Sequence, residues 1–207
     1  MKRRLLLALA MGFGFGLLNL TAIAPASAAD KVIRFGLIPS EDAEKLIKDS
    51  GPFIAALEKS LGMKVQPFVA IDYSAVIEAL KSDKLEIAFL GPAAYVLAKD
   101  KVKVGVEPVA RGVMQETGKS SYKGLIIANP ATPIKTLADL KTRTFAFVDP
   151  ASTSGNFVPR YVFSKNNIDP EKDFKSVFYS GTHQATLIAV KEGKVDAGSI
   201  ADEVYDL

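Results

Sequence analysis

Three consecutive hydroxyl side chains and a glycine, Ser152, Thr153, Ser154 and Gly155, carry the most distinctive chemistry in this chain, and we call them the hydroxyl turn. They follow the apolar run 144–148, which predicts a buried strand, and precede a helix expected to begin near Phe157. A helix N-terminus has unpaired backbone N–H groups and the positive end of the helix dipole, so it suits an anion. One Ser or Thr is enough for an ordinary helix cap. On these residues alone, an anion site and a cap both stay open.

Other polar side chains fall at the same kind of position, where a predicted strand passes into a helix. His183, the only histidine in the chain, follows the expected strand 177–181, and Asp202 and Glu203 follow the last short strand. A lone histidine is more often structural, yet this placement favours a role in binding. Tyr73 comes directly after another strand and offers an aromatic face and a donor, although a half-buried packing role is the slightly favoured interpretation.

Strands and helices are expected to alternate along the chain, which predicts an α/β fold with a mostly parallel sheet. The expected strands are 31–39, 64–70, 85–90, 122–128, 144–148, 177–181 and 194–200. Ligands bind at the carboxyl ends of such strands, so the polar clusters above are expected to converge on one pocket. In the first half of the chain the junctions that qualify are 39–40, 71–73 and 91–93.

Helices are expected between these strands. Pro52 is expected to interrupt the helical pattern that starts at Ser40, which leaves a helix from Pro52 to Leu61. Further helices are expected after Asp72, over 93–98, over 134–140, from Phe157 to about Asn166, and from Thr182 onward. The apolar, extended segment 104–114 and the strand 122–128 are expected to form the crossing between two lobes.

The first 28 residues have the features of a secretory signal peptide. Lys2, Arg3 and Arg4 form a basic region, residues 5–18 are apolar, and 26–28 are small residues that suit cleavage after Ala28. The chain has no cysteine, which excludes a lipid-anchored cysteine and any disulfide. We therefore expect a free periplasmic protein.

The net charge of the chain comes from this leader. The sequence has 26 Lys and Arg against 23 Asp and Glu, and removing the three basic residues of the leader leaves 23 of each sign. The basic balance is therefore no evidence for a nucleic-acid or membrane partner, and neither partner is expected. The remainder is long enough for one sizeable core or two small lobes.

Several short motifs resemble the phosphate/phosphite/phosphonate-binding proteins of ABC importers, over essentially the whole mature chain. These motifs are 35–40, 70–73, 89–92, 149–155, 158–159 and 181–183. The resemblance implies a two-lobed type II periplasmic binding protein with a hinge, which closes on an oxyanion and then docks on an inner-membrane permease. It implies no cofactor and a monomer. The first lobe is expected over 29–117 and the second over 118–207.

The resemblance also implies a set of ligand-binding residues: Tyr73, Tyr95, Tyr122, Ser152, Thr153, Ser154, His183, Asp202 and Glu203. The hydroxyl residues would hold the phosphorus oxygens, the histidine would donate to another oxygen, and the tyrosines would close on the ligand. Tyr95 is the candidate for the first-lobe wall. Glu203 matches an acidic residue that meets a ligand ammonium in aminophosphonate binders, and Asp202 is an alternative acceptor. A carboxylate here repels an anion unless the ligand carries a proton or an amine.

Family members continue for many tens of residues beyond residue 207, so the part that completes the first lobe is expected to be missing from this sequence. Two alternatives to an importer component remain. A phosphate-ester hydrolase would need a nucleophile with a base, or a metal cluster, which one histidine and no cysteine make hard to assemble. A periplasmic sensor domain would have the same fold and a signalling partner instead of a permease.

Overall fold

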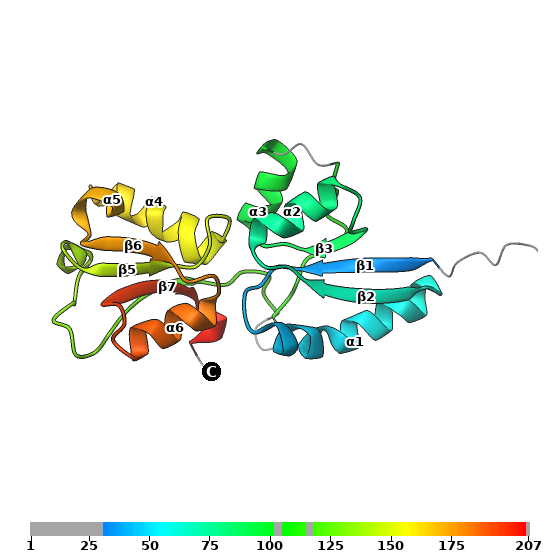
Figure 1. Cartoon of the computed structure of the whole chain (residues 1–207), viewed down its shortest axis with the longest axis horizontal. Coiled ribbons are helices and arrows are strands. Elements are labelled where there is room, and N and C mark those ends of the chain that lie inside the picture. The colour runs from blue at the N-terminus through cyan, green and yellow to red at the C-terminus, as the bar shows by residue number, and fades with distance from the viewer. Residues whose placement is uncertain (1–30, 102–104, 115–117, 206–207) are drawn as a thin grey trace, which may run out of the picture.

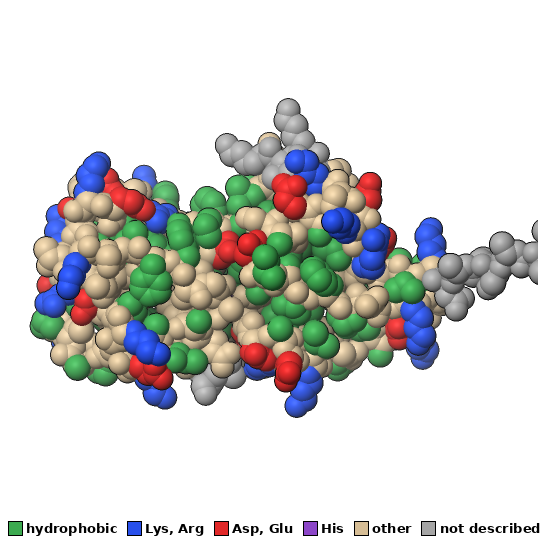
Figure 2. Space-filling view, viewed as in Figure 1, with side chains coloured by type: hydrophobic (Ala, Val, Ile, Leu, Met, Phe, Trp, Pro, Cys, Tyr) green, Lys and Arg blue, Asp and Glu red, His purple; other side chains and the backbone are tan. Residues whose placement is uncertain are grey.

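The computed structural model describes residues 31–101, 105–114 and 118–205, which form two α/β lobes side by side (Figure 1, Figure 2). The expected signal peptide and its cleavage site lie outside these residues. Within the described part of the chain, no helix has the length and apolar character needed to cross a membrane.

The first lobe is a three-stranded parallel sheet in the order β2-β1-β3. Its elements are β1 (Val32–Leu37), α1 (Ala43–Leu61), β2 (Lys64–Val69), α2 (Tyr73–Lys81), β3 (Ile87–Phe89), α3 (Pro92–Val96) and the π-helical turn η1 (Leu97–Lys101). Helix α1 covers one face of the sheet, and α2 and α3 cover the other (Figure 1). Because the three strands are parallel, their carboxyl ends lie at the same edge of the sheet, which faces the second lobe.

The second lobe is a four-stranded sheet in the order β4-β7-β5-β6, in which only the β4–β7 pair is antiparallel. Its elements are β4 (Gly124–Ala128), η2 (Leu137–Leu140), β5 (Thr144–Phe147), η3 (Thr153–Phe157), α4 (Val158–Lys165), α5 (Pro170–Asp173), β6 (Ser176–Tyr179), α6 (His183–Lys191), β7 (Ala197–Ala201) and η4 (Asp202–Val204). Helices α4 and α5 lie on one face and α6 on the other (Figure 1). The prediction of mixed, mostly parallel sheets in two lobes is confirmed.

Strand β5 is anchored by an aromatic cluster. The ring of Phe145 lies 4.8 Å from that of Phe147 and 5.4 Å from those of Phe163 and Phe174, centroid to centroid. All four side chains are buried, and each such pair contributes about 0.5–1.5 kcal/mol beyond its burial. The carboxyl end of β5, from which the hydroxyl turn starts, is therefore firmly supported.

The expected break at Pro52 is wrong, because α1 runs without interruption from Ala43 to Leu61. Asp42 caps its first turn by accepting from the N–H groups of Glu44 and Lys45, and Gly62 ends the helix in the left-handed conformation. Proline removes one helical hydrogen bond, at a cost of about 3 kcal/mol in an isolated helix. Apolar residues on both sides of Pro52 pack on β1 and β2, and this tertiary packing outweighs the local preference.

The helix expected to begin near Phe157 is confirmed as α4, which starts at Val158, and the wide turn η3 from Thr153 to Phe157 precedes it. In an α-helix the N–H of residue 159 would donate to the carbonyl of Gly155, but residue 159 is proline and has no N–H. The Gly155 carbonyl instead accepts from the backbone N–H of Val148, at 3.0 Å, and from the hydroxyl of Ser199, at 2.8 Å. The hydroxyl turn is thus part of the helical entry, tied to β5 and β7.

The expected extended crossing segment has no strand in its described part, residues 105–114. Most of these residues are exposed, and the side chain of Val109 is 88% exposed. The second segment expected in the crossing forms β4, which is an edge strand of the second sheet. The strand expected over 122–128 is therefore confirmed, and the role of both segments as the crossing between the lobes stays a prediction.

Candidate functional site

The hydroxyl turn combines a helix cap with unpaired donors. The Ser152 hydroxyl accepts from the N–H of Gly155 at 3.1 Å, so the cap interpretation of the sequence is confirmed for this residue. Thr153 and Ser154 are the first two residues of η3, and their N–H groups therefore have no carbonyl partner within it. Ser154 is buried, and no described residue hydrogen-bonds to its hydroxyl group. The turn thus offers two N–H groups and one hydroxyl close together.

The first lobe reaches this turn at two of its strand-to-helix junctions. The Thr153 hydroxyl accepts from the N–H of Ala93, in the first turn of α3, at 3.0 Å. The N–H of Tyr73, at the start of α2, lies 3.4 Å from the Asp149 carboxylate, which is a long hydrogen bond. Both contacts join the carboxyl ends of strands from different lobes, so the site is shared between the lobes.

The phenol of Tyr73 lies at this junction. Tyr73 is 2% exposed and belongs to an apolar core that joins the first lobe to Val148 and Ala151 of the second, so its ring has a packing role. Burial raises the pKa of the phenol well above its ordinary value, the Ser152 side chain beside it lowers that pKa in part, and the charges of Asp149 and Tyr122 raise it further. The phenol therefore stays protonated and can donate a hydrogen bond. Because Tyr122 acts on the pKa of Tyr73, it lies near the same junction.

His183 opens α6 on the other side of the junction. Its backbone N–H donates to the carbonyl of Ser40 in the first lobe at 2.9 Å. Its imidazole Nδ1 accepts from the N–H of Ala201 at 3.1 Å. The side chain is buried, and this burial lowers the pKa of the imidazole to about 4. The histidine therefore connects the end of β7 to the first lobe while carrying no charge at neutral pH.

This buried, neutral histidine predicts a specific pH dependence of stability. The unfolded chain takes up a proton on His183 near pH 6.5, whereas the folded protein does so only near pH 4. The free energy of unfolding is thus expected to fall by about 3 kcal/mol as the pH drops through this window, at about 1.4 kcal/mol per pKa unit. Urea unfolding of the wild type and of His183→Gln between pH 4 and 7.5 measures the difference. If the free energies of unfolding of the two proteins changed with pH in parallel, the predicted role of His183 in the pH dependence would be wrong.

The acidic end of β7 lies beside the start of β4. Asp202 accepts from the N–H of Lys123 at 2.9 Å through its carboxylate, and its own N–H donates to the Lys123 carbonyl. The next residue, Gly124, faces Ser154 so closely that an added Cβ would lie 3.3 Å from the Ser154 Cβ. Asp202 is half-buried and Glu203 is exposed. The structure therefore brings Asp202 toward the hydroxyl turn, with Glu203 on the outer side.

Tyr95 is the predicted residue that the structure does not join to this cluster. It lies on α3 and is half-buried. The ammonium of Lys99 lies 5.8 Å from the centroid of its ring. Among the described contacts, none links Tyr95 to the hydroxyl turn.

Asp149 is a residue of the junction for which no role was predicted. Its carboxylate accepts from the N–H of Ala151 at 2.7 Å, and its carbonyl accepts from the N–H of Ser152 at 2.9 Å. The residue is 5% exposed, and burial raises the pKa of its carboxyl. An acidic residue directly after an apolar strand, inside the same motif as the hydroxyl turn, is the signal that could have identified it.

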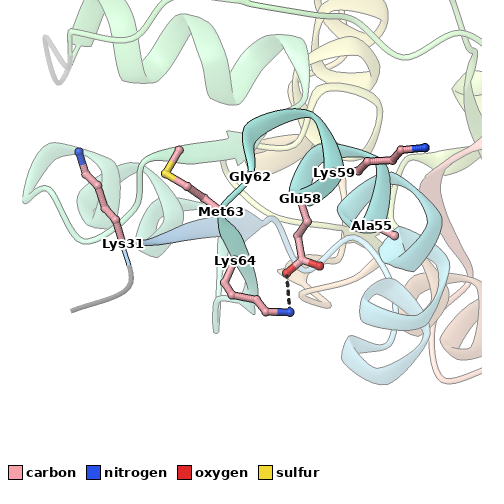
Figure 3. Close-up of a pocket in the computed structure, with 7 residues that line it drawn as sticks. All are labelled: Lys31, Ala55, Glu58, Lys59, Gly62, Met63 and Lys64. Atoms are coloured by element: carbon pink, nitrogen blue, oxygen red, sulfur yellow. Dashed lines mark ion pairs between the residues drawn. The ribbon is translucent and has the colours of Figure 1, made fainter. Parts of the chain in front are cut away.

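The cavities described for this structure lie away from the junction. One, of about 560 Å³, is at the amino end of β2 and is lined by Lys31, Ala55, Glu58, Lys59, Gly62, Met63 and Lys64 (Figure 3). A second, of about 470 Å³, lies beside the end of α2. Neither is lined by a predicted site residue. Within the described residues, no group of three or more His, Cys, Asp or Glu side chains could hold a metal ion.

The fold and the junction between the lobes are those of a type II periplasmic binding protein. A binding protein component of an ABC phosphonate transporter from Pseudomonas aeruginosa superposes with a TM-score of 0.78 at 35% identity, over 86% of this chain and 59% of that one. The PhnD1 protein of Prochlorococcus marinus, solved with methylphosphonate, gives a TM-score of 0.72 at 26% identity, over 86% of this chain and 66% of that one.

Comparison of the sequence with known proteins shows the family of this chain. The family model of the periplasmic phosphonate substrate-binding proteins of ABC transporters matches residues 35–207. The phosphonates-binding periplasmic protein of Escherichia coli is 35% identical over 211 residues, which cover all of this chain and 61% of that protein. The chain therefore belongs to the family of periplasmic substrate-binding proteins of ABC phosphonate transporters, and it spans about three fifths of the length of this relative.

Proposed function

We propose that this protein is the solute-binding component of an ABC importer and captures a phosphorus oxyanion between its lobes. The proposal is supported by contacts between the lobes at their strand ends: the Thr153 hydroxyl with Ala93, Tyr73 beside Ser152, and the backbone of His183 with Ser40. A tetrahedral oxyanion needs several convergent donors, and this junction supplies hydroxyl, phenol, imidazole and backbone N–H groups. The family match and the methylphosphonate complex of a relative support the same ligand class.

The roles proposed for individual residues follow from this geometry. The N–H groups of Thr153 and Ser154 and the Ser154 hydroxyl hold the oxygens of the ligand. Tyr73 and Tyr122 donate from the side of the first lobe. Asp202 and the more exposed Glu203 face the substituent of the ligand. They favour a ligand that carries a proton or an ammonium group. Tyr95 is the weakest member of the proposed set, since its described contacts lie elsewhere.

The wider setting is also part of the proposal. The protein is exported through a signal peptide cleaved after Ala28, works as a monomer in the periplasm, and delivers its ligand to an inner-membrane permease. Residues 29–117 form the first lobe, completed by a segment beyond residue 207, and 118–207 form the second. It binds no nucleic acid, and it releases the ligand without chemical change; the hydrogen bonds described for Ser152 and His183 go to backbone groups and do not pair a nucleophile with a base.

Calorimetric titration with phosphite, methylphosphonate, 2-aminoethylphosphonate and phosphate tests this proposal. We expect binding at micromolar concentration or tighter to at least one of these ligands, and none to acetate, whose planar carboxylate presents too few oxygens. Incubation with p-nitrophenyl phosphate is expected to release no nitrophenolate. Absence of binding to every phosphorus oxyanion would contradict the proposal, and turnover of the ester would support a hydrolase instead.

A further inference from the structure

The hydrogen bond to His183 fixes which imidazole nitrogen carries the proton. A neutral imidazole has one N–H donor and one acceptor nitrogen. Nδ1 accepts from the N–H of Ala201, at the end of β7, and both residues are buried. A proton on Nδ1 would place two donors against each other in a buried position. The proton therefore lies on Nε2, and the imidazole is a neutral donor through that atom.

The other donors at the junction are neutral as well. They are the Tyr73 phenol, which its surroundings keep protonated, the Ser154 hydroxyl, and the first N–H groups of η3. Arg160, the cation that follows the hydroxyl turn, donates from Nε to the Asn156 side chain of η3 at 2.7 Å. Its guanidinium lies 2.7 Å from the Glu171 carboxylate and 4.2 Å from the centre of the Phe147 ring.

The charges closest to these donors are negative. Asp149 is buried in the turn that precedes Ser152, and Asp202 lies beside Gly124 and Ser154. The titratable residues on the segments next to the start of α6 are Glu41, Asp42, Lys123, Asp149, Asp202 and Glu203. Burial, and not one of these charges, is what lowers the pKa of His183. A second negative charge on the ligand would meet repulsion from these carboxylates, and Lys123, the described cation on these segments, is exposed.

We propose that the site selects the singly charged form of its oxyanion, which still carries a proton or is balanced by an ammonium, with His183 as a permanently neutral Nε2–H donor. This inference rests on the proposed function. It makes the protonation state of the ligand, and not that of the protein, the source of any pH dependence of binding. A phosphorus oxyacid loses its second proton near neutral pH, at about pH 6 for a phosphate monoester, so the two forms are separable by titration.

The first test is the affinity for methylphosphonate from pH 5.5 to 8.5. We expect the affinity to fall about tenfold per pH unit above the second pKa of the ligand, in proportion to its monoanion. Methyl methylphosphonate, a monoester that is singly charged throughout, is expected to show a flat profile. Affinity that rises with pH would overturn this inference alone. No binding of either probe at any pH would overturn it together with the proposed function.

The second test uses the single histidine of the chain. In ¹⁵N-labelled protein without ligand, we expect an unprotonated Nδ1 and a protonated Nε2 at every pH from 5.5 to 8. A doubly protonated ring at pH 5.5, or a proton on Nδ1, would overturn the assignment whatever the ligand does. His183→Gln, which places a neutral amide donor near Nε2, is expected to weaken methylphosphonate binding by less than about tenfold, whereas His183→Asn, which reaches only the Nδ1 position, weakens it by more. Equal losses would contradict a neutral donor at Nε2.

Discussion

Replacing Ser152, Thr153 and Ser154 together by alanine is expected to weaken phosphonate binding by at least about tenfold. The variant removes the proposed hydrogen bond from the Ser154 hydroxyl, and a hydrogen bond to a charged ligand contributes about 1.5–3 kcal/mol. It also removes the Ser152 cap and the contact of Thr153 with Ala93, which hold the turn in place. Calorimetric titration with the tightest ligand of the panel measures the loss, and circular dichroism checks the fold. Ser164→Ala, which removes an exposed hydroxyl on α4, is the matched control and should leave affinity unchanged.

The single variants should separate the two roles of the hydroxyl turn. Ser152→Ala removes the hydroxyl that accepts from Gly155, so it should cost about 0.5–2 kcal/mol of stability as well as affinity. Ser154→Ala removes a hydroxyl that no described residue hydrogen-bonds, so it should reduce affinity and leave the unfolding midpoint nearly unchanged. If the triple variant bound as tightly as the wild type, the assignment of the site would be wrong.

Gly155→Ala should both destabilise the protein and abolish binding. A Cβ at this position would lie 2.4 Å from the Cβ and Cγ2 atoms of Val148 and 2.8 Å from the hydroxyl oxygen of Ser152. Val148 is fully buried at the end of β5, so the turn and not the strand must move. Overpacking of this kind costs about 1–3 kcal/mol, and the displaced turn loses its capping geometry. Urea unfolding and calorimetric titration measure the two effects.

Gly51→Ala is the control for this change. Gly51 lies inside α1, and an added Cβ would meet no atom within 4 Å. Because alanine favours a helix over glycine by about 0.5–1 kcal/mol, stability should be equal or higher and binding unchanged. A similar destabilisation in both variants would show that the crowding at Gly155 is not the cause.

Much of the fold could be predicted because its signals are local. The apolar runs around Phe35 and Phe145 specify strands, and Asp72 and Thr182 cap the helices that follow two others. The prediction failed at Pro52, where tertiary contacts override a local rule. This proline lies in a helix that is held by its packing on the sheet.

The site was predictable as a set of positions but not as a set of contacts. Strand-end junctions identified Tyr73, His183 and the hydroxyl turn, because the topology of a parallel sheet brings such ends together. No local pattern indicates that the Thr153 hydroxyl meets Ala93 of the other lobe, since that distance depends on how the two sheets face each other. The buried carboxylate of Asp149 was missed for the same reason: its partner, Tyr73, is 76 residues away in the sequence.

Hydrogen bonds that cross between the lobes stabilise one arrangement of the two lobes before any ligand binds. Thr153 with Ala93, His183 with Ser40, and Asp149 with Tyr73 hold the lobes together through protein groups alone. Net contributions of about 0.5–1.5 kcal/mol each stabilise this arrangement of the two lobes without a ligand. If the proposed ligand binds to the lobes in this arrangement, less free energy is spent on bringing them together, which raises the apparent affinity.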